Sequence, residues 1–382
     1  MCNRRRALSV VLCLCVSGAP MVARTQTPAP PMSEELTVAA AGWAALGAGK
    51  AAEAAAIGAK GLDRYPRSAT IASLLVSVEA ERGNAAAALA AYERWLGSSS
   101  LEDPYLLRPV ALALLREMTA STVPPEVRRA AFRALADAGD VAALAELGQR
   151  STAGGLIELE VLAARGSEPA IRSLIASVKA MPGDKGRLIS ALVDTRSQLA
   201  VAPLTDLLKD PNPDNRAAAA DGLGRLGATG AATALRPLLN DAQFSVKFAT
   251  ARALYRLHDY SGVSLLQTLQ TSEAPLLRVQ ALEAMSSEVG PPWIDAVRVL
   301  LSDADPQVRL LAARLIAPYD SGAASAAFNA LMTDSNIAIQ EAAGRVYVEQ
   351  VVTDVAAMRR YFRSGDPLTR VTSANRLLEL TR

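Results

Sequence analysis

The sequence predicts an all-α protein whose helical hairpins stack into an α-solenoid superhelix. Its 382 residues are 51% hydrophobic but only 4% aromatic, and the chain is rich in alanine and leucine, which enter helices at little cost. Two internal periods repeat the helical pattern, one of 34 residues within residues 34–97 and one of 31 residues from Ala200 onward. Periods of this length are typical of solenoids, in which neighbouring repeats bury each other's apolar faces.

Residues 1–23 have the pattern of a secretory signal peptide. Three arginines precede an apolar run that ends near Ala23, and a Pro-rich linker, residues 24–33, follows. The run is too short for a lasting membrane helix. We therefore expect a protein without a stable membrane span that is exported to the periplasm or secreted. Two alternatives stay open, namely twin-arginine export and a lipoprotein anchor at Cys15.

The cysteines and the net charge also depend on this segment. Cys2, Cys13 and Cys15 are the three cysteines of the chain, so the mature protein would have no disulfide, thiolate metal ligand or cysteine nucleophile. Removing the arginines of the segment lowers the basic residues from 40 to 37 against 38 acidic ones, a formal net charge of −1. Such a chain lacks the field of a nucleic-acid or anionic-membrane binder. Neither is an expected partner.

Residues 34–97 contain the 34-residue period. Gly49 and Gly83 are 34 residues apart, and each divides two alanine-rich helical stretches. This spacing resembles a pair of tetratricopeptide repeats. The sequence departs from that pattern at Gly58, where a large residue is usual, and at Val76 and Trp95, where small ones are. Divergent helical hairpins of the same solenoid are the alternative interpretation.

The 31-residue period keeps several columns of residues in register. One column is acidic or polar and begins each turn, and a basic column follows it six residues later. Apolar columns surround them and predict two amphipathic helices per unit. The turn column is Asp210, Asp241, Ser272, Asp303 and Asp334; the second column is Arg216, Lys247, Arg278, Arg309 and Gln340; one apolar column is Leu207, Leu238, Leu269, Leu300, Leu331 and Phe362.

The segment Asp-Pro-Asn-Pro-Asp-Asn-Arg-Ala-Ala-Ala-Ala-Asp-Gly-Leu-Gly-Arg-Leu-Gly, residues 210–227, resembles a HEAT repeat of the short, bilin-lyase-like class. The resemblance extends over residues 101–382 as eight or nine units, of which residues 365–380 look like a terminal cap. It implies a structural ladder in which the turn aspartates pair with basic residues. The implied pairs are Asp210 with Arg216, Asp241 with Lys247 and Asp303 with Arg309, and the ladder weakens at Asp334, which lacks a basic partner.

Residues that could carry chemistry are scarce. His258 is the one histidine, so a histidine-based triad or multi-histidine metal site is excluded, and its place after a predicted helix favours a capping role. Gly222-Leu-Gly224 lies within a repeat helix rather than after a strand, so it is not a dinucleotide loop. Asp210, Asp214 and Asp221 are explained by the repeat. We expect no catalytic residue, no metal and no cofactor.

The predicted concave face is the remaining place for a binding site. One outward column on the second helices alternates in sign at first, which favours salt bridges between repeats. The alternative is a mixed-charge groove that holds a protein segment, since tyrosine and arginine are enriched at interface hot spots. The outward column is Asp221, Arg252, Glu283, Arg314 and Arg345, and the candidate partner-binding residues are Arg252, Tyr255, Arg256, Glu283 and Arg314.

The function that fits these features is a non-catalytic, exported scaffold or adaptor that binds other proteins through the solenoid surface. Two alternatives stay open. One is an enzyme or enzyme-accessory protein of the HEAT-like lyase class, which the resemblance suggests but a thiol-free mature chain does not favour. The other is a structural spacer in envelope assembly.

Overall fold

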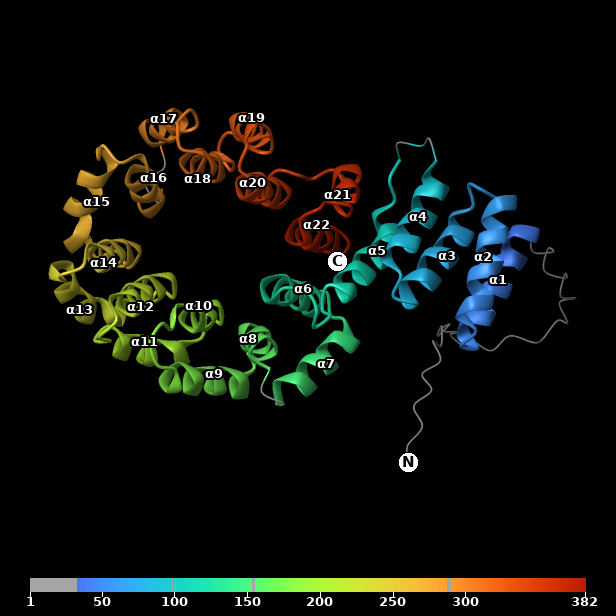
Figure 1. The fold of residues 1–382 in the computed structure, drawn as a ribbon, viewed down its shortest axis with the longest axis horizontal. Helices are drawn as coiled ribbons and strands as arrows, with labels where there is room; N and C mark the ends of the chain where they lie inside the picture. The colour runs from blue at the N-terminus through green and yellow to red at the C-terminus, as the bar shows by residue number, and fades with distance from the viewer. Residues whose placement is uncertain (1–32, 98, 100, 153–154, 287–289) are drawn as a thin grey trace, which may run out of the picture.

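The computed structural model describes residues 33–97, 99, 101–152, 155–286 and 290–382. Within these ranges every regular element is a helix, which confirms the all-α solenoid (Figure 1). The predicted signal peptide and Pro-rich linker lie outside the described residues, Ser33 excepted. None of the described helices is long and apolar enough to cross a membrane.

An N-terminal arm of five helices projects from the rest of the molecule (Figure 1). Each helix packs against the next, and the turns after the first and third contain Gly49 and Gly83 at φ values of +75° and +73°. The arm thus consists of helical hairpins with the expected 34-residue spacing, and their assignment as tetratricopeptide repeats stays a prediction. The helices are α1 (Glu34–Gly47), α2 (Ala51–Arg64), α3 (Ala69–Glu81), α4 (Ala85–Leu96) and α5 (Pro104–Glu117).

From residue 125 onward the helices alternate between an inner and an outer layer of a ring (Figure 1). The inner layer is α6 (Pro125–Asp137), α8 (Leu156–Ala164), α10 (Gly186–Asp194), α12 (Pro213–Arg225), α14 (Phe244–Arg256), α16 (Pro275–Ala284), α18 (Pro306–Ile316), α20 (Ile337–Gln350) and α22 (Pro367–Leu380). The outer layer is α7 (Val141–Thr152), α9 (Glu168–Ala180), α11 (Val201–Leu207), α13 (Ala232–Leu235), α15 (Val263–Gln270), α17 (Pro291–Leu300), α19 (Ser321–Leu331) and α21 (Val355–Tyr361). Short 3₁₀ turns accompany the middle outer helices, namely η1 (Gln198–Ala200), η2 (Thr229–Ala231), η3 (Arg236–Asn240) and η4 (Tyr260–Gly262).

The apolar columns of the 31-residue period form the contact between the two layers. One column is fully buried, and its members are Leu204, Leu235, Leu266, Val297 and Phe328. Four members of the column three residues later are buried, but Leu207 and Leu238 remain half-exposed. Their helices are short and continue as 3₁₀ turns or end there, so this position turns partly toward solvent.

The turn that follows α14 contains His258 in the left-handed backbone region, at a φ value of +60°. Gly227 occupies the same position one repeat earlier, at +65°. The amide of His258 donates to the carbonyl of Tyr255, and that of Asp259 to the carbonyl of Leu254, which is the hydrogen bonding of a helix C-terminal motif. The histidine therefore lies where the repeat calls for glycine, and its backbone rather than its ring satisfies the terminal carbonyls.

The ring closes through its C-terminal helix, contrary to the expectation that residues 365–380 form a terminal cap. Helix α22 packs against both α5 and α6 (Figure 1). Its residues Val371, Ala374, Leu377 and Leu378 belong to the same buried apolar cluster as Leu107 and other residues of α5. A terminal cap keeps a polar outer face. Helix α22 instead has apolar residues on both faces, which lets it join the two ends of the solenoid.

Candidate functional site on the inner wall

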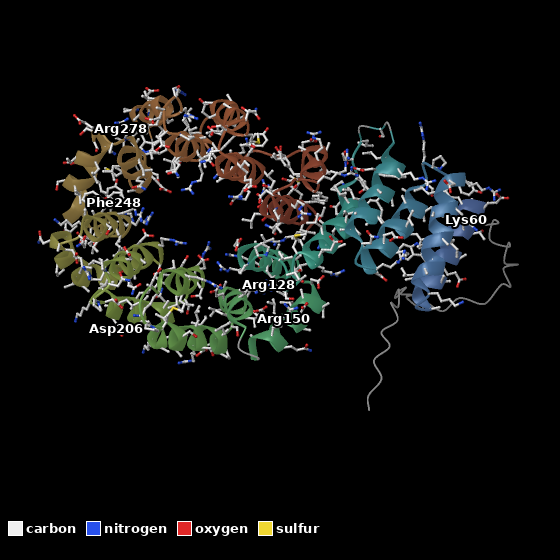
Figure 2. The ribbon with its side chains drawn as sticks, in the orientation of Figure 1. Lys60, Arg128, Arg150, Asp206, Phe248 and Arg278 are labelled. Carbon is white, nitrogen blue, oxygen red and sulfur yellow. The ribbon has the colours of Figure 1, made fainter. Side chains whose placement is uncertain are left out.

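The inner wall consists of the side chains that the inner-layer helices direct toward the inside of the ring. Helix α10 illustrates how the sequence produces it. Leu188, Ile189, Leu192 and Val193 are buried against neighbouring helices, whereas Arg187, Ser190 and Asp194 line cavities with residues of α6, α8 and α12. Figure 2 shows nitrogen-tipped side chains that project inward from α10, α12 and α14.

Glu160 of α8 is the most deeply buried acidic group of the wall, with 4% of its surface exposed. Its carboxylate lies 2.9 Å from Nε of Arg129 on α6 and 3.0 Å from Nε of Arg187 on α10. Both arginine side chains stay more than a third exposed. A buried carboxylate is stable only with partners, and here two cations share one anion.

Asp194 of α10 repeats this arrangement one level along the wall. Its carboxylate lies 3.6 Å from a terminal nitrogen of Arg133 on α6 and 3.3 Å from one of Arg225 on α12. All three side chains are at least one third exposed. These longer, wetter pairs contribute little to stability, so Arg133 and Arg225 remain available to other anions.

Asp221 of α12 is the third shared carboxylate. It lies 2.8 Å from Arg252 and 2.7 Å from Arg256, both on α14. Across the ring the stoichiometry changes, because Arg314 pairs with Glu283 alone, at 2.6 Å. The expected salt bridges between repeats are therefore present at Asp221–Arg252 and Glu283–Arg314. Four of the five candidate partner-binding residues lie on the inner wall in these pairs.

Tyr255 does not belong to this surface, contrary to the sequence interpretation. It is 4% exposed and packs with Phe248 and Ala251 in a separate apolar cluster, with its ring edge-on to that of Tyr260 at 5.6 Å between centroids. Residues 248, 251 and 255 form one stripe of α14, as the helical period requires. That stripe faces α15, whereas Arg252 and Arg256 face the inside.

We call the six arginines and three shared carboxylates the arginine arc. It has a formal surplus of three positive charges over five consecutive inner helices, α6 to α14. Its members are Arg129, Arg133, Arg187, Arg225, Arg252 and Arg256 with Glu160, Asp194 and Asp221.

The arc borders cavities that meet one another. A cavity of about 360 Å³ lies between α6, α8 and α10, and one of about 510 Å³ lies between α6, α10, α12 and α14. Arg133 and Asp194 line both. Arg133 also lines a third, of about 570 Å³, between α6, α20 and α22 where the ring closes. The hollow along the wall is therefore elongated.

The turn aspartates form a second ladder, and its pairing differs from the expected one. Arg216 does not bond the carboxylate of Asp210 six residues before it. Its guanidinium donates to the backbone carbonyl of Asp210 at 2.8 Å and, at 2.9 and 3.0 Å, to the carboxylate of Asp241 in the next repeat. The predicted gap at Asp334 is also wrong, because Arg309 of the preceding repeat lies 3.3 Å away. This ladder fixes the spacing of repeats.

Hydrogen bonds from Arg216 and from the amide of Gln243 hold the pKa of Asp241 below its usual range. The pKa of Asp210 is lowered too, since bonds from Lys185, Asn212 and Asn215 outweigh the opposing effect of its desolvation. Both carboxylates are thus structural anions at neutral pH. Within the described residues, no group of three or more His, Cys, Asp and Glu side chains could hold a metal ion.

Sequence reasoning missed most of the arginine arc. Asp194, Arg225 and Arg256 are spaced 31 residues apart and were open to discovery as a column. Arg129, Arg133 and Glu160 lie in the irregular repeats before residue 184, where no common period aligns them with the rest. Their convergence depends on the curvature of the ring.

Comparison with known proteins agrees with this architecture. The family model described as HEAT repeats matches residues 169–255 and 201–286. The chain contains HEAT repeats. No curated protein sequence matches this HEAT-repeat chain.

Among solved structures, the HEAT-repeat chain is similar to the complex of CpcE and CpcF of phycocyanin lyase from Nostoc sp. PCC7120. The identity is 18% and the TM-score 0.38 over 72% of this chain and 95% of that one. It is also similar to human deoxyhypusine hydroxylase, at 17% identity and a TM-score of 0.34 over 75% of this chain and 99% of that one. At these values neither likeness carries an activity to this chain.

Proposed function

We propose that this HEAT-repeat ring is a non-catalytic, exported scaffold that holds a segment of another protein on its inner wall. HEAT-repeat folds are compatible with interaction scaffolds. The observation that carries the proposal is the arginine arc, where exposed arginines from five helices border connected cavities. Arginine is enriched at interface hot spots because its guanidinium combines charge, planar packing and several donors.

The non-catalytic part rests on the chemistry of the same wall. Its ionisable groups are arginines, whose high pKa makes them poor proton donors, and carboxylates that they already bond. The candidate residue His258 lies at an outer turn, remote in function from the wall, with its backbone used for capping. The proposed export rests on the basic-then-apolar order of residues 1–23 and on the cysteines confined to them.

Blocking the wall tests the scaffold. Ser190 is exposed on α10 and lines the 360 Å³ cavity, so Ser190→Trp fills that space. Ser173→Trp on the outer helix α9, also exposed, is the matched control. In affinity capture from extract of the native host, the control is expected to retain the proteins that the wild type retains, and Ser190→Trp to lose them. Equal capture by both variants contradicts the proposal.

Export has a separate test. Fractionation of the native host is expected to place a shortened chain without Cys2, Cys13 and Cys15 outside the cytoplasm. Full-length protein in the cytosol contradicts export, and lipid attached at Cys15 replaces release by a lipoprotein anchor.

A further inference from the structure

We infer that the segment bound on the inner wall is an extended, acidic stretch of polypeptide whose carboxylates bind the arginine arc. This inference rests on the proposed scaffold function and specifies its partner. The charge of the wall is the first argument. The arc has twice as many arginines as carboxylates, although the described chain as a whole is close to neutral in composition.

The arginines have donors to spare. A guanidinium carries five N–H donors, and each ion pair of the arc occupies a minority of them. The side chains of Arg129, Arg133, Arg187 and Arg225 are 38%, 54%, 44% and 44% exposed. The unused donors therefore reach solvent in the cavities, where carboxylates can bind them in a bidentate manner.

The shape of the wall favours an extended segment over a small anion. A small anion needs one enclosed pocket in which several donors converge on a single point. Here the 360 and 510 Å³ cavities share Arg133 and Asp194 and extend over five helices. The surplus charge is spread along them in three arginine pairs, so a ligand with several separated negative charges matches it better.

The chemistry of the wall favours a peptide over nucleic acid. Single-stranded nucleic acid binds on aromatic side chains that stack with its bases, and no aromatic residue lines either of these two cavities. The shared carboxylates would also lie against a continuous phosphate backbone. A peptide can place glutamates opposite the arginine pairs and small residues opposite Glu160, Asp194 and Asp221.

The shared carboxylates allow a test that preserves the fold. The triple variant Arg129→Gln, Arg133→Gln, Arg256→Gln removes three positive charges, yet Glu160, Asp194 and Asp221 each keep one arginine. The control Arg172→Gln, Arg236→Gln, Arg298→Gln removes the same charge from the outer elements α9, η3 and α17, where these arginines pair with exposed or surface carboxylates. Circular dichroism and thermal melts verify that both remain folded.

The probe is a fluorescent peptide of about twelve residues in which glutamates alternate with glycine and serine, titrated against the full chain by anisotropy. We expect the triple variant to bind at least about tenfold more weakly than the wild type and the control to stay within about twofold. Raising the salt concentration from about 50 to 300 mM should weaken wild-type binding similarly. Equal binding by both variants overturns the inference. Tighter binding of single-stranded DNA of equal charge, or displacement of the peptide by millimolar inorganic phosphate, overturns it as well.

The two proposals fail in different ways. If Ser190→Trp loses the captured host proteins but the arginine triple variant keeps them, the wall binds protein and the acidic segment is wrong. If Ser190→Trp keeps them, the proposed function itself fails, whatever the peptide does.

Discussion

Arg359 of α21 and Glu102, which precedes α5, lie 257 residues apart in the chain and pair at 3.0 Å. The same guanidinium lies 2.8 Å from Glu93 of α4, so one side chain ties the last outer helix to two parts of the N-terminal arm. Nearby, Arg108 of α5 donates to the hydroxyl of Thr381 at 2.8 Å. These polar contacts surround the apolar packing of α22 on α5 and α6 and orient the closure of the ring.

The apolar part of the closure should decide whether the ring stays shut. Leu377 on α22 is fully buried in the shared cluster, whereas Leu380 on the same helix is 45% exposed. Leu377→Glu buries an unpaired charge and is expected to weaken the closure by about 3 kcal/mol or more. Small-angle X-ray scattering should show a larger radius of gyration for Leu377→Glu and an unchanged one for Leu380→Glu. An unchanged radius for both would mean that α22 does not close the ring.

The two apolar columns of the repeats should differ in their importance for stability. Leu235 is fully buried and Leu238 half-exposed. Leu235→Ala is expected to lower the free energy of unfolding by about 2–5 kcal/mol. For Leu238→Ala we expect about 1 kcal/mol, since half of its transfer free energy is already absent. Urea unfolding measures both. A larger cost at Leu238 would reverse the assigned orientation of the η3 segment.

The turn ladder makes stability depend on pH. The pKa of Asp241 is lowered in the folded state, chiefly by its hydrogen bond to Arg216. A lowered carboxyl pKa means that its contribution is present above the unfolded value of 3.8 and is lost as the pH falls through the folded value. Asp241→Asn should therefore destabilise the protein by about 1 kcal/mol at pH 7. The difference from the wild type should shrink below pH 4, which urea titrations at the two pH values can check. A constant difference would contradict the ladder.

The left-handed turn position gives a pair of opposite predictions. His258 has a φ value of +60°, which costs a residue with a side chain about 1 kcal/mol, whereas glycine adopts it freely. His258→Gly is expected to raise the free energy of unfolding by about 0.5–1 kcal/mol, and Gly227→Ala to lower it by about 1 kcal/mol. Thermal melts compare the two variants. Stabilisation by Gly227→Ala would show that the turn is not left-handed.

Local features of this fold were predictable from the sequence, and long-range ones were not. Leu235 and Leu266 reveal the repeat because each is buried by a neighbour at a fixed distance along the chain. The pairing of Arg216 with Asp241 was missed because the sequence offers a basic residue both six positions after and 25 positions before each turn aspartate. Only the stacking of repeats decides between them.

Ring closure and the arginine arc share one reason for having escaped prediction. Both depend on the curvature summed over many repeats, which brings Leu377 to α5 and Arg133 to Asp194. No sequence period encodes that sum. The error at Tyr255 was smaller in scale: a shift of one residue along α14 separates the inner wall, at Arg256, from a buried stripe.

The central claim, that the inner wall holds a segment of a partner protein, is most directly tested by site-specific photo-crosslinking. In a chain whose Cys2, Cys13 and Cys15 are replaced by serine, one cysteine is introduced either at Ser190 on the inner wall or at Ser173 on the outer helix α9 and labelled with benzophenone. After illumination in host extract, the account predicts a discrete crosslinked partner from position 190 and none from position 173. A crosslink from position 173 with none from position 190 would contradict it.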